Sequence, residues 1–344
     1  MIRLTWLQFR VQALIAVVAM AITALVLAVT GARLAHLYST SVATCTVQGD
    51  CDTATNAFRL HDQFLQNMLG PLLLVVPGLI GIFWGAPLIA REVQAGTFRL
   101  AWTQSVSRRR WLAVKLGSLG LASAIVAGLL SLIVTWWFSP LDRVNANRFS
   151  PGVFDERGIV IIGYAVFAFV LGVTAGVLLR RTLPAMAMSL ALFVGVRLAV
   201  TYLIRPHLVS PAHTSVPVTS ATGLGFGSSG SSGVVTFIAK TPRIPNAWVI
   251  SSQIVEKSGH LASTAVLHQF LMTACPDIAN QQAGANQGTF GACVAKVSAN
   301  YHLVLAYQPA NRYWTFQWYE TAIFVFLAFA LAGLCFWWVS NRLT

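Results

Sequence analysis

The sequence predicts an all-α polytopic membrane protein with six transmembrane helices, a short N-terminal interfacial helix and a small extracellular α+β domain between the fifth and sixth helices. Three observations support this fold class. Hydrophobic residues make up 56% of the chain and charged residues 10%, whereas about 25% of residues in a soluble domain are charged. Six apolar runs are each long enough to cross a bilayer as a helix, which takes about 20 residues. A long polar stretch, residues 206–313, separates the fifth run from the sixth.

The six apolar runs cover residues 12–34, 69–90, 112–138, 158–179, 183–204 and 317–339. Tryptophan and tyrosine border several of them, as is typical where a helix meets the membrane interface. Two prolines and three glycines in the second run predict a kinked or closely packed helix. They are Pro71, Pro77, Gly78, Gly81 and Gly85. The domains expected from this layout are residues 1–205, 206–313 and 314–344.

The first ten residues support two interpretations. Ile2, Trp6 and Phe9 fall on one helical face, flanked by Arg3 and Arg10. This pattern suits a short helix lying in the membrane interface. The same residues also suit the beginning of the first transmembrane helix.

Positive charge is distributed unevenly between the two sides of the membrane that six spans create. One side holds 11 cations and a single acid, Glu92, on short segments, and the other holds 11 cations and eight acids on far more chain. Short loops rich in Lys and Arg stay on the cytoplasmic side. We therefore expect a multi-pass cell-membrane protein with both termini in the cytoplasm. The formal charge of +13 does not indicate a nucleic-acid partner, because the cations lie between apolar runs rather than on one soluble face.

The stretch 206–313 is long enough to form a small domain. Residues 234–239 and 247–255 resemble strands, residues 261–274 resemble a helix, and an apolar run at 301–309 leads into the last span. Four cysteines fall in segments expected outside the membrane, where thiols tend to pair. Three connectivities are possible, and closeness in sequence favours Cys45–Cys51 and Cys275–Cys293.

Residues 87–117 contain a recognisable pattern, PLIAREVQAGTFRLAWTQSVSRRRWLAVKLG. It resembles the region after the second span of ABC-2 type transporter permeases. The opening MIRLTWLQFR and the stretch YQPANRYWTFQWYETAIF are similar to the corresponding ends of an actinobacterial subgroup of that family. Val93 and Gln94 depart from the pattern, because acidic or aromatic residues are common there.

The resemblance implies a permease that works with a separate ABC-type ATPase, expected in two copies, and with a second permease chain, giving a homodimer. In such permeases the segment after the second span, here about residues 91–105, forms a cytoplasmic coupling helix that docks on the ATPase. Glu92, Gly96, Thr97 and Arg99 would belong to that contact, and Arg91 begins the same segment. Arg108, Arg109 and Arg110 would lie near membrane lipid headgroups or the ATPase surface.

The chain itself contains no G-x-x-x-x-G-K-[ST] sequence, which is the motif that cradles nucleotide phosphates. We therefore expect no enzyme activity, no catalytic residues and no cofactor bound by this chain, with ATP and Mg²⁺ held by the partner ATPase. Its seven histidines show no metal-ligand spacing. No metal site is predicted.

Two ionisable residues lie well inside the apolar runs, Arg197 in the fifth and Glu320 in the sixth. A single charge is costly to bury in a membrane, so these two are predicted to form a structural pair. A substrate-binding role for either charge is the alternative.

Together these features predict an ATP-driven exporter permease for a hydrophobic or amphipathic compound such as a drug, peptide or lipid. The alternative is a non-transporting membrane sensor or immunity subunit that binds a ligand through its extracellular domain. A membrane-embedded enzyme is less well supported, since no paired carboxylates, metal ligands or activated nucleophile stand out.

Overall fold

The computed structural model describes residues 2–45, 48–61, 63–96, 107–145, 148–218, 224–229, 234–239, 241–242, 244–276 and 287–342. The chain divides into two units. The helical unit comprises Met1–Leu208 and Tyr313–Thr344, and the second unit comprises Val209–Arg312. Each unit is described separately below.

Among the described residues, six helices are long and apolar enough to span a membrane, which is the number predicted from the sequence. They are Phe9–Val42, Gln63–Gln94, Arg108–Val144, Val160–Leu179, Thr182–His207 and Ala310–Asn341. In chain order the helical unit contains α1 (Ile2–Leu37), η1 (Tyr38–Val42), α2 (Gln48–Leu60), α3 (Gln63–Ile80), η2 (Gly81–Gly85), α4 (Ala86–Gln94), α6 (Arg108–Asn145), α7 (Pro151–Asp155), α8 (Val160–Leu179), α9 (Thr182–Ala199), η3 (Val200–Ile204), η4 (Arg205–His207) and α13 (Tyr313–Asn341).

The N-terminal residues do not form a separate interfacial helix, contrary to the prediction. Helix α1 runs unbroken from Ile2 to Leu37. The physical reason is the absence of a helix breaker, since the sequence has neither proline nor glycine between Ile2 and Thr30. The first ten residues are thus continuous with the helix of the first candidate span, Phe9–Val42.

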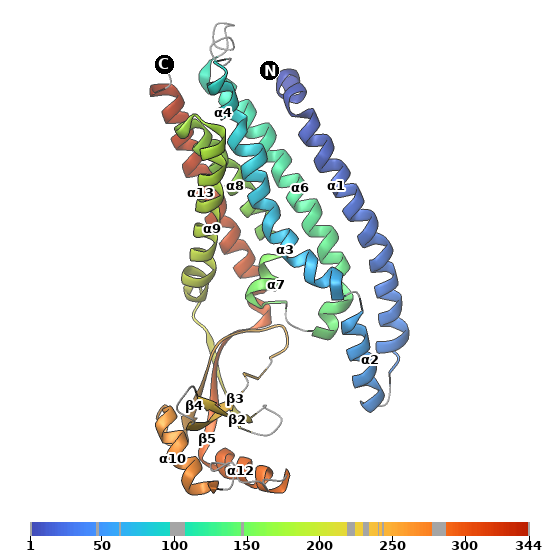
Figure 1. Ribbon diagram of the computed structural model, residues 1–344, viewed down its shortest axis with the longest axis vertical. Helices are drawn as coiled ribbons and strands as arrows, with labels where there is room; N and C mark the ends of the chain where they lie inside the picture. Colours follow the sequence, from blue (N-terminus) through green and yellow to red (C-terminus); the bar gives the residue numbers. More distant parts are fainter. Residues whose placement is uncertain are drawn as a thin grey trace. The chain divides into compact units, whose positions relative to one another are not determined.

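Helix α8 lies at the centre of the helical unit (Figure 1), where α3, η2, α4, α6, α9 and α13 all pack against it. In an apolar 18-residue stretch of α8, 89% of the residues are buried, whereas only 6% are buried in the corresponding stretch of the first span. A helix that is apolar on all sides is expected in such a central position. Helix α1 packs mainly on α6 and leaves most of its apolar surface uncovered.

The second span is closely packed, which is one of the two forms predicted for it. Its middle is the π-helical turn η2, which contacts α8 through backbone. A methyl group added at Gly81 would lie 2.6 Å from the carbonyl oxygen of Ala168 on α8. Pro87 has no N–H to donate to the Phe83 carbonyl four residues earlier, and the side-chain amide of Gln12 on α1 donates to that oxygen instead, at 3.2 Å.

The second unit is a small α+β domain, which agrees with its predicted class. Strands β1 (Ala212–Pro217), β5 (Tyr301–Gln308) and β4 (Trp248–Glu256) form an antiparallel sheet in the order β1-β5-β4. A hairpin of β2 (Leu224–Ser229) and β3 (Val234–Ala239) and the helices α10 (Thr264–Ala274) and α12 (Gln287–Asn300) complete the unit. The apolar run at 301–309 was expected only to lead into the last span. It is instead the central strand, with Leu303 and Leu305 fully buried.

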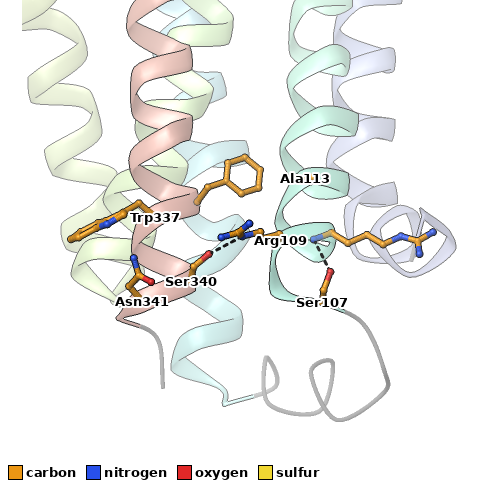
Figure 2. A pocket seen from close by; sticks show the side chains of 8 residues that line it. Ser107, Arg109, Ala113, Trp337, Ser340 and Asn341 are labelled. Carbon is orange, nitrogen blue, oxygen red and sulfur yellow. Dashed lines mark hydrogen bonds between the residues drawn. The ribbon is translucent and has the colours of Figure 1, made fainter.

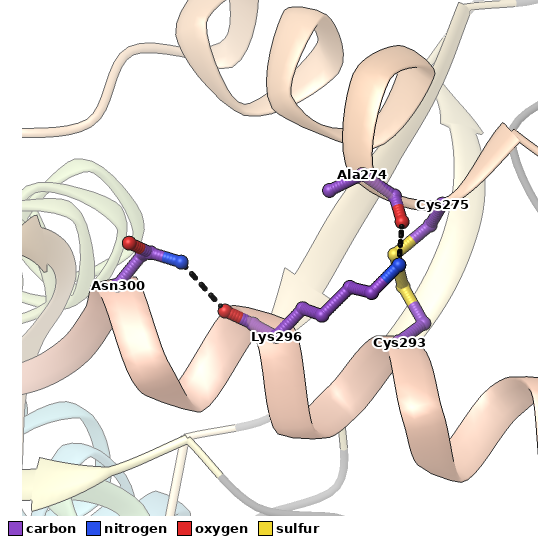
Figure 3. Close-up of a disulfide and its surroundings, with 5 residues drawn as sticks. All are labelled: Ala274, Cys275, Cys293, Lys296 and Asn300. Atoms are coloured by element: carbon purple, nitrogen blue, oxygen red, sulfur yellow. Dashed lines mark hydrogen bonds between the residues drawn. A yellow bond between two sulfur atoms is a disulfide. The ribbon is translucent and has the colours of Figure 1, made fainter.

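Both predicted disulfides, Cys45–Cys51 and Cys275–Cys293, are present. The second joins the end of α10 to α12 (Figure 3) and lies in a core with Leu271, Val297 and Leu303. Beside it, Nζ of Lys296 donates a hydrogen bond to the carbonyl oxygen of Ala274, at 2.7 Å, which satisfies an acceptor left open at the helix end.

Removing the Cys275–Cys293 disulfide should destabilise the second unit by about 3 kcal/mol, because the bond closes a loop whose ends are 18 residues apart. The measurement is the urea concentration at which limited proteolysis begins to cut residues 209–312 in a Cys275→Ala/Cys293→Ala variant. A Cys45→Ala/Cys51→Ala variant is the control and should leave that concentration unchanged. Equal effects of the two variants would contradict the prediction.

Candidate functional site

Helices α4 and α6 flank the predicted coupling segment at the end of the helical unit that carries both chain termini (Figure 1), here called the terminal end. A buried ion pair joins these two helices. Nζ of Lys115 on α6 donates to Oε1 of Glu92 on α4, and their side chains are 3% and 14% exposed. The ammonium group also lies 4.8 Å from the ring of Trp111. The Glu92 carboxylate therefore faces α6, and its ion pair with Lys115 joins the helix before the predicted coupling segment to the helix after it.

The other residues predicted for coupling differ in their surroundings. Arg91 is exposed on α4. Gly96 follows the end of α4 with φ +68°, a left-handed conformation that favours glycine after a helix. Thr97 and Arg99 lie outside the described residues, as does the rest of the segment up to residue 106. Arg108 is half-buried, whereas Arg109 and Arg110 are exposed at the beginning of α6.

A cluster of charged side chains is buried at the opposite end of the helical unit. It consists of Asp155 from α7, Tyr164 from α8, Arg197 from α9, Thr201 from η3, Arg205 from η4 and Glu320 from α13. Two arginines and two carboxylates give it a formal charge of zero. Glu320 is 0% exposed and Arg205 1% exposed, so the centre of this buried charge cluster is out of contact with solvent.

Arg205 is the centre of the cluster. Its Nε and Nη2 atoms donate to the two carboxylate oxygens of Glu320, each at 2.7 Å, the bidentate geometry that favours arginine over lysine. Nη2 also bonds Oδ1 of Asp155. The hydroxyl of Tyr164 donates to Oε1 of Glu320. Burying these ions is tolerable because each carboxylate has a cationic partner.

The predicted Arg197–Glu320 pair is not formed. Nη2 of Arg197 lies 3.6 Å from Oδ2 of Asp155, and Nη1 donates to the carbonyl oxygen of Leu74 on α3, at 2.8 Å. Its guanidinium also lies 4.7 Å from the Tyr164 ring. Arg197 thus binds α7 and α3, whereas Glu320 pairs with Arg205.

Asp155, Tyr164 and Arg205 were not predicted from the sequence as members of the cluster. Arg205 stands beside Pro206, where the apolar run ends, so it was counted with the charges outside the membrane. A signal was present, because Arg197, Thr201 and Arg205 recur every four residues and share one helical face. Asp155 follows a proline–glycine pair in a connecting segment, and no periodicity there indicates burial.

A family model described as ABC-2 membrane transporter related matches residues 17–205, more than half of the chain. The chain belongs to this family. No curated protein and no solved structure matches it. The match extends from within α1 to Arg205 and therefore includes five spans, the segment between α4 and α6, and most of the buried charge cluster. Glu320 and the second unit lie beyond the matched range.

Family membership establishes a multi-pass membrane transport protein and implies, in general, an ABC-type ATPase as its partner. In this ABC-2 protein a cavity of about 510 Å³ lies between α3 and α9. Its walls are mostly apolar, and Asp155, Arg197 and Thr201 of the buried charge cluster line it as well. An apolar cavity with a few polar groups is the usual form of a small-molecule site. Among the described residues, no three His, Cys, Asp or Glu side chains are grouped to hold a metal ion.

Glu156, next to the cluster between α7 and α8, should make the stability of this ABC-2 protein depend on pH. Its carboxylate packs against Gly70 of α3. Burial raises its pKa above the ordinary value of 4.5, with Asp155 adding to the rise and Arg157 opposing it. The folded state therefore holds the proton more tightly than the unfolded state, and the free energy of unfolding should fall as pH rises from about 4.5 through the raised pKa.

A Glu156→Gln variant should lose this part of the pH dependence and be more stable than the natural protein at neutral pH. The measurement is the thermal unfolding midpoint in detergent between pH 4 and pH 8. Asp52→Asn, at an exposed position of α2, is the control and should leave the slope unchanged. A slope that persists in Glu156→Gln would contradict the assignment.

Proposed function

We propose that this protein is the permease subunit of an ATP-driven transporter that exports a hydrophobic or amphipathic compound, such as a drug, peptide or lipid. Membership of the ABC-2 membrane transporter related family is the observation that carries the proposal. The chain supplies the membrane pathway, and a separate ATPase, expected in two copies, binds ATP and Mg²⁺.

The segment between α4 and α6 is the proposed point of coupling to the ATPase. The buried Glu92–Lys115 pair supports this role, because it ties the second and third spans together next to that segment. A displacement of the segment by the ATPase would then move both helices together rather than one of them alone. Short packed elements that move together are a recurrent way to transmit such a change.

The terminal end is proposed to face the cytoplasm, since the exposed arginines Arg91, Arg109, Arg110, Arg180 and Arg181 lie on segments that end there. The second unit would then lie outside the cell, where its disulfide is chemically stable. A second permease chain is expected to complete the pathway. The uncovered apolar surface of α1 is consistent with such a neighbour, with lipid as the other candidate for covering it.

The cavity between α3 and α9 supports an amphipathic cargo. Apolar residues such as Leu74, Leu190 and Phe193 would hold the hydrophobic part, and Arg197 would attract a polar or anionic part. The substrate-binding role considered for Arg197 is thus compatible with its structural contacts to Asp155 and Leu74.

The alternative function is that of a sensor or immunity subunit that binds a ligand without transport. The observation in its favour is the second unit, which has its own hydrophobic core and disulfide. Under this alternative the protein would bind a ligand through that unit, and no ATPase activity would depend on it.

Reversing the charge of Arg91 should release the partner ATPase. Arg91 is exposed on α4 beside the proposed coupling segment, where a docked ATPase would bury it. Replacing one partner of a buried charge pair at an interface typically costs about 2–5 kcal/mol, which is at least a tenfold loss of affinity. The measurement is mass spectrometry of proteins that co-purify with tagged natural protein, Arg91→Glu and Arg342→Glu. Arg342 is the matched control, because it is also exposed at the terminal end but follows α13.

Loss of an ABC-type ATPase from Arg91→Glu alone would support the proposal. Natural protein that purifies without any ATPase, even after cross-linking, would argue against coupling and favour the alternative function. Equal loss in Arg91→Glu and Arg342→Glu would show only a general effect of charge, and the coupling assignment would then be wrong.

A further inference from the structure

A second cavity, of about 680 Å³, lies at the terminal end between the beginning of α6 and the end of α13. Figure 2 shows Arg109 extending from α6 towards Ser340 of α13. The lining residues combine guanidinium, hydroxyl and amide groups with aromatic rings. They are Ser107, Arg109, Arg110, Ala113, Phe336, Trp337, Ser340 and Asn341. No acidic residue is among them.

The two arginines are poorly neutralised within the part of the chain that the structure describes. Nε of Arg109 makes one long hydrogen bond, 3.5 Å, to the Ser340 hydroxyl, and no described carboxylate forms a salt bridge with either guanidinium. Each guanidinium has five N–H donors. Most of the hydrogen-bonding capacity of Arg109 and Arg110 is therefore directed at groups outside the described chain.

We propose that this cavity binds the headgroup phosphate of an anionic phospholipid in the leaflet that surrounds the terminal end. The guanidinium of Arg109 matches the charge and the bidentate hydrogen bonding of a phosphate, and Arg110, the next residue of α6, also lines the cavity and adds positive charge there. Basic pockets between transmembrane helices on the cytoplasmic side are a known way to hold such headgroups. Hydroxyl and amide donors from Ser340 and Asn341 are placed to bind the remaining oxygens of the headgroup.

A lipid explains the aromatic lining better than a soluble partner does. Trp337 is 51% exposed near the end of a membrane-spanning helix, a position where indole rings lie at the level of lipid headgroups. Phe336 and Ala113 line the cavity one helical turn or less from the polar groups, so an acyl chain leaving the phosphate would meet apolar surface. The site requires only that the helices span a membrane, so it does not depend on transport or on an ATPase.

The test measures lipid binding to purified, delipidated full-length protein in detergent by native mass spectrometry. The probes are phosphatidylglycerol and phosphatidylcholine with the same acyl chains, and inorganic phosphate. Arg109→Gln/Arg110→Gln removes both cations of the cavity. The matched control, Arg180→Gln/Arg181→Gln, removes two adjacent exposed cations from the α8–α9 connection, which does not line the cavity.

The natural protein should bind phosphatidylglycerol at least tenfold more tightly than phosphatidylcholine, and Arg109→Gln/Arg110→Gln should abolish the difference while the control keeps it. Equal binding of the two lipids, or an equal loss in the control, would overturn the proposal. So would displacement of the lipid by inorganic phosphate at a similar concentration, which would indicate a site for a free anion.

A variant that retains phosphatidylglycerol but no longer binds an ATPase would assign Arg109 and Arg110 to that partner and overturn the lipid site. Size-exclusion chromatography establishes that each variant is folded. If Arg109→Gln/Arg110→Gln does not fold, the comparison of the two lipids on the natural protein and on Arg109→Gln alone still decides the question.

Discussion

Replacing Arg205 with glutamine is expected to destabilise the helical unit by about 3–5 kcal/mol, the usual cost of removing one partner from a buried ion pair. Arg205 donates to both oxygens of Glu320 and also to Asp155. The substitution would leave two carboxylates facing each other across Tyr164, with Arg197 as the remaining cation of the cluster. The measurement is the unfolding midpoint of the detergent-solubilised protein in a denaturant titration.

Two further variants separate the role of Arg205 from a general loss of charge. Arg205→Gln/Glu320→Gln removes one charge of each sign and should recover part of the lost stability, since no unpaired ion remains at that pair. Arg197→Gln should cost less than Arg205→Gln, because its distance to Asp155 is longer, at 3.6 Å. An Arg197→Gln variant that is the least stable of the three would mean that the centre of the cluster is wrongly assigned.

Replacing Gly172 with alanine should be the most disruptive single-methyl change in the second and fourth spans, with an expected cost of about 1–3 kcal/mol or more. A methyl group at Gly172 of α8 would overlap the carbonyl of Gly81 and lie 2.8 Å from the backbone nitrogen of Ala86. Backbone atoms cannot rotate away as a flexible side chain can, so α8 and η2 would have to separate.

Gly195 on α9 is the matched control for Gly172. A methyl group at Gly195 would meet nothing within 4 Å, and alanine is favoured over glycine in a helix by about 1 kcal/mol. Gly195→Ala should therefore be neutral or slightly stabilising. The measurement is the thermal unfolding midpoint of both variants in the same detergent. Similar midpoints for Gly172→Ala and Gly195→Ala would contradict the close approach of α8 and η2.

Much of the architecture could be predicted from local sequence. The six spans follow from runs of apolar residues, because burying about 20 such residues in lipid needs no knowledge of neighbouring helices. The two disulfides follow from short separations along the chain. The close packing of the second span was indicated by its glycines, which allow another backbone to approach closely wherever they are placed.

The N-terminal helix and strand β5 show where local patterns were insufficient. Ten residues carry too weak an amphipathic signal to separate an interfacial helix from the first turns of a span, and the uninterrupted chain continues as α1. The run at 301–309 lies next to the last span, so its hydrophobicity suggested continuity with that span. Its pairing on both sides with β1 and β4 depends on residues far away in the sequence.

Local sequence alone predicts six membrane-spanning helices, an arginine-rich end of the helical unit, and a need for partners at Arg197 and Glu320. Which partners these two residues have depends on how the helices pack. The reason is that the partners come from elements far apart in the sequence, and no local pattern specifies which elements pack together. Glu320 of α13 receives both hydrogen bonds from Arg205, whereas Arg197 lies near Asp155 of the short helix α7 and donates to Leu74 of the second span.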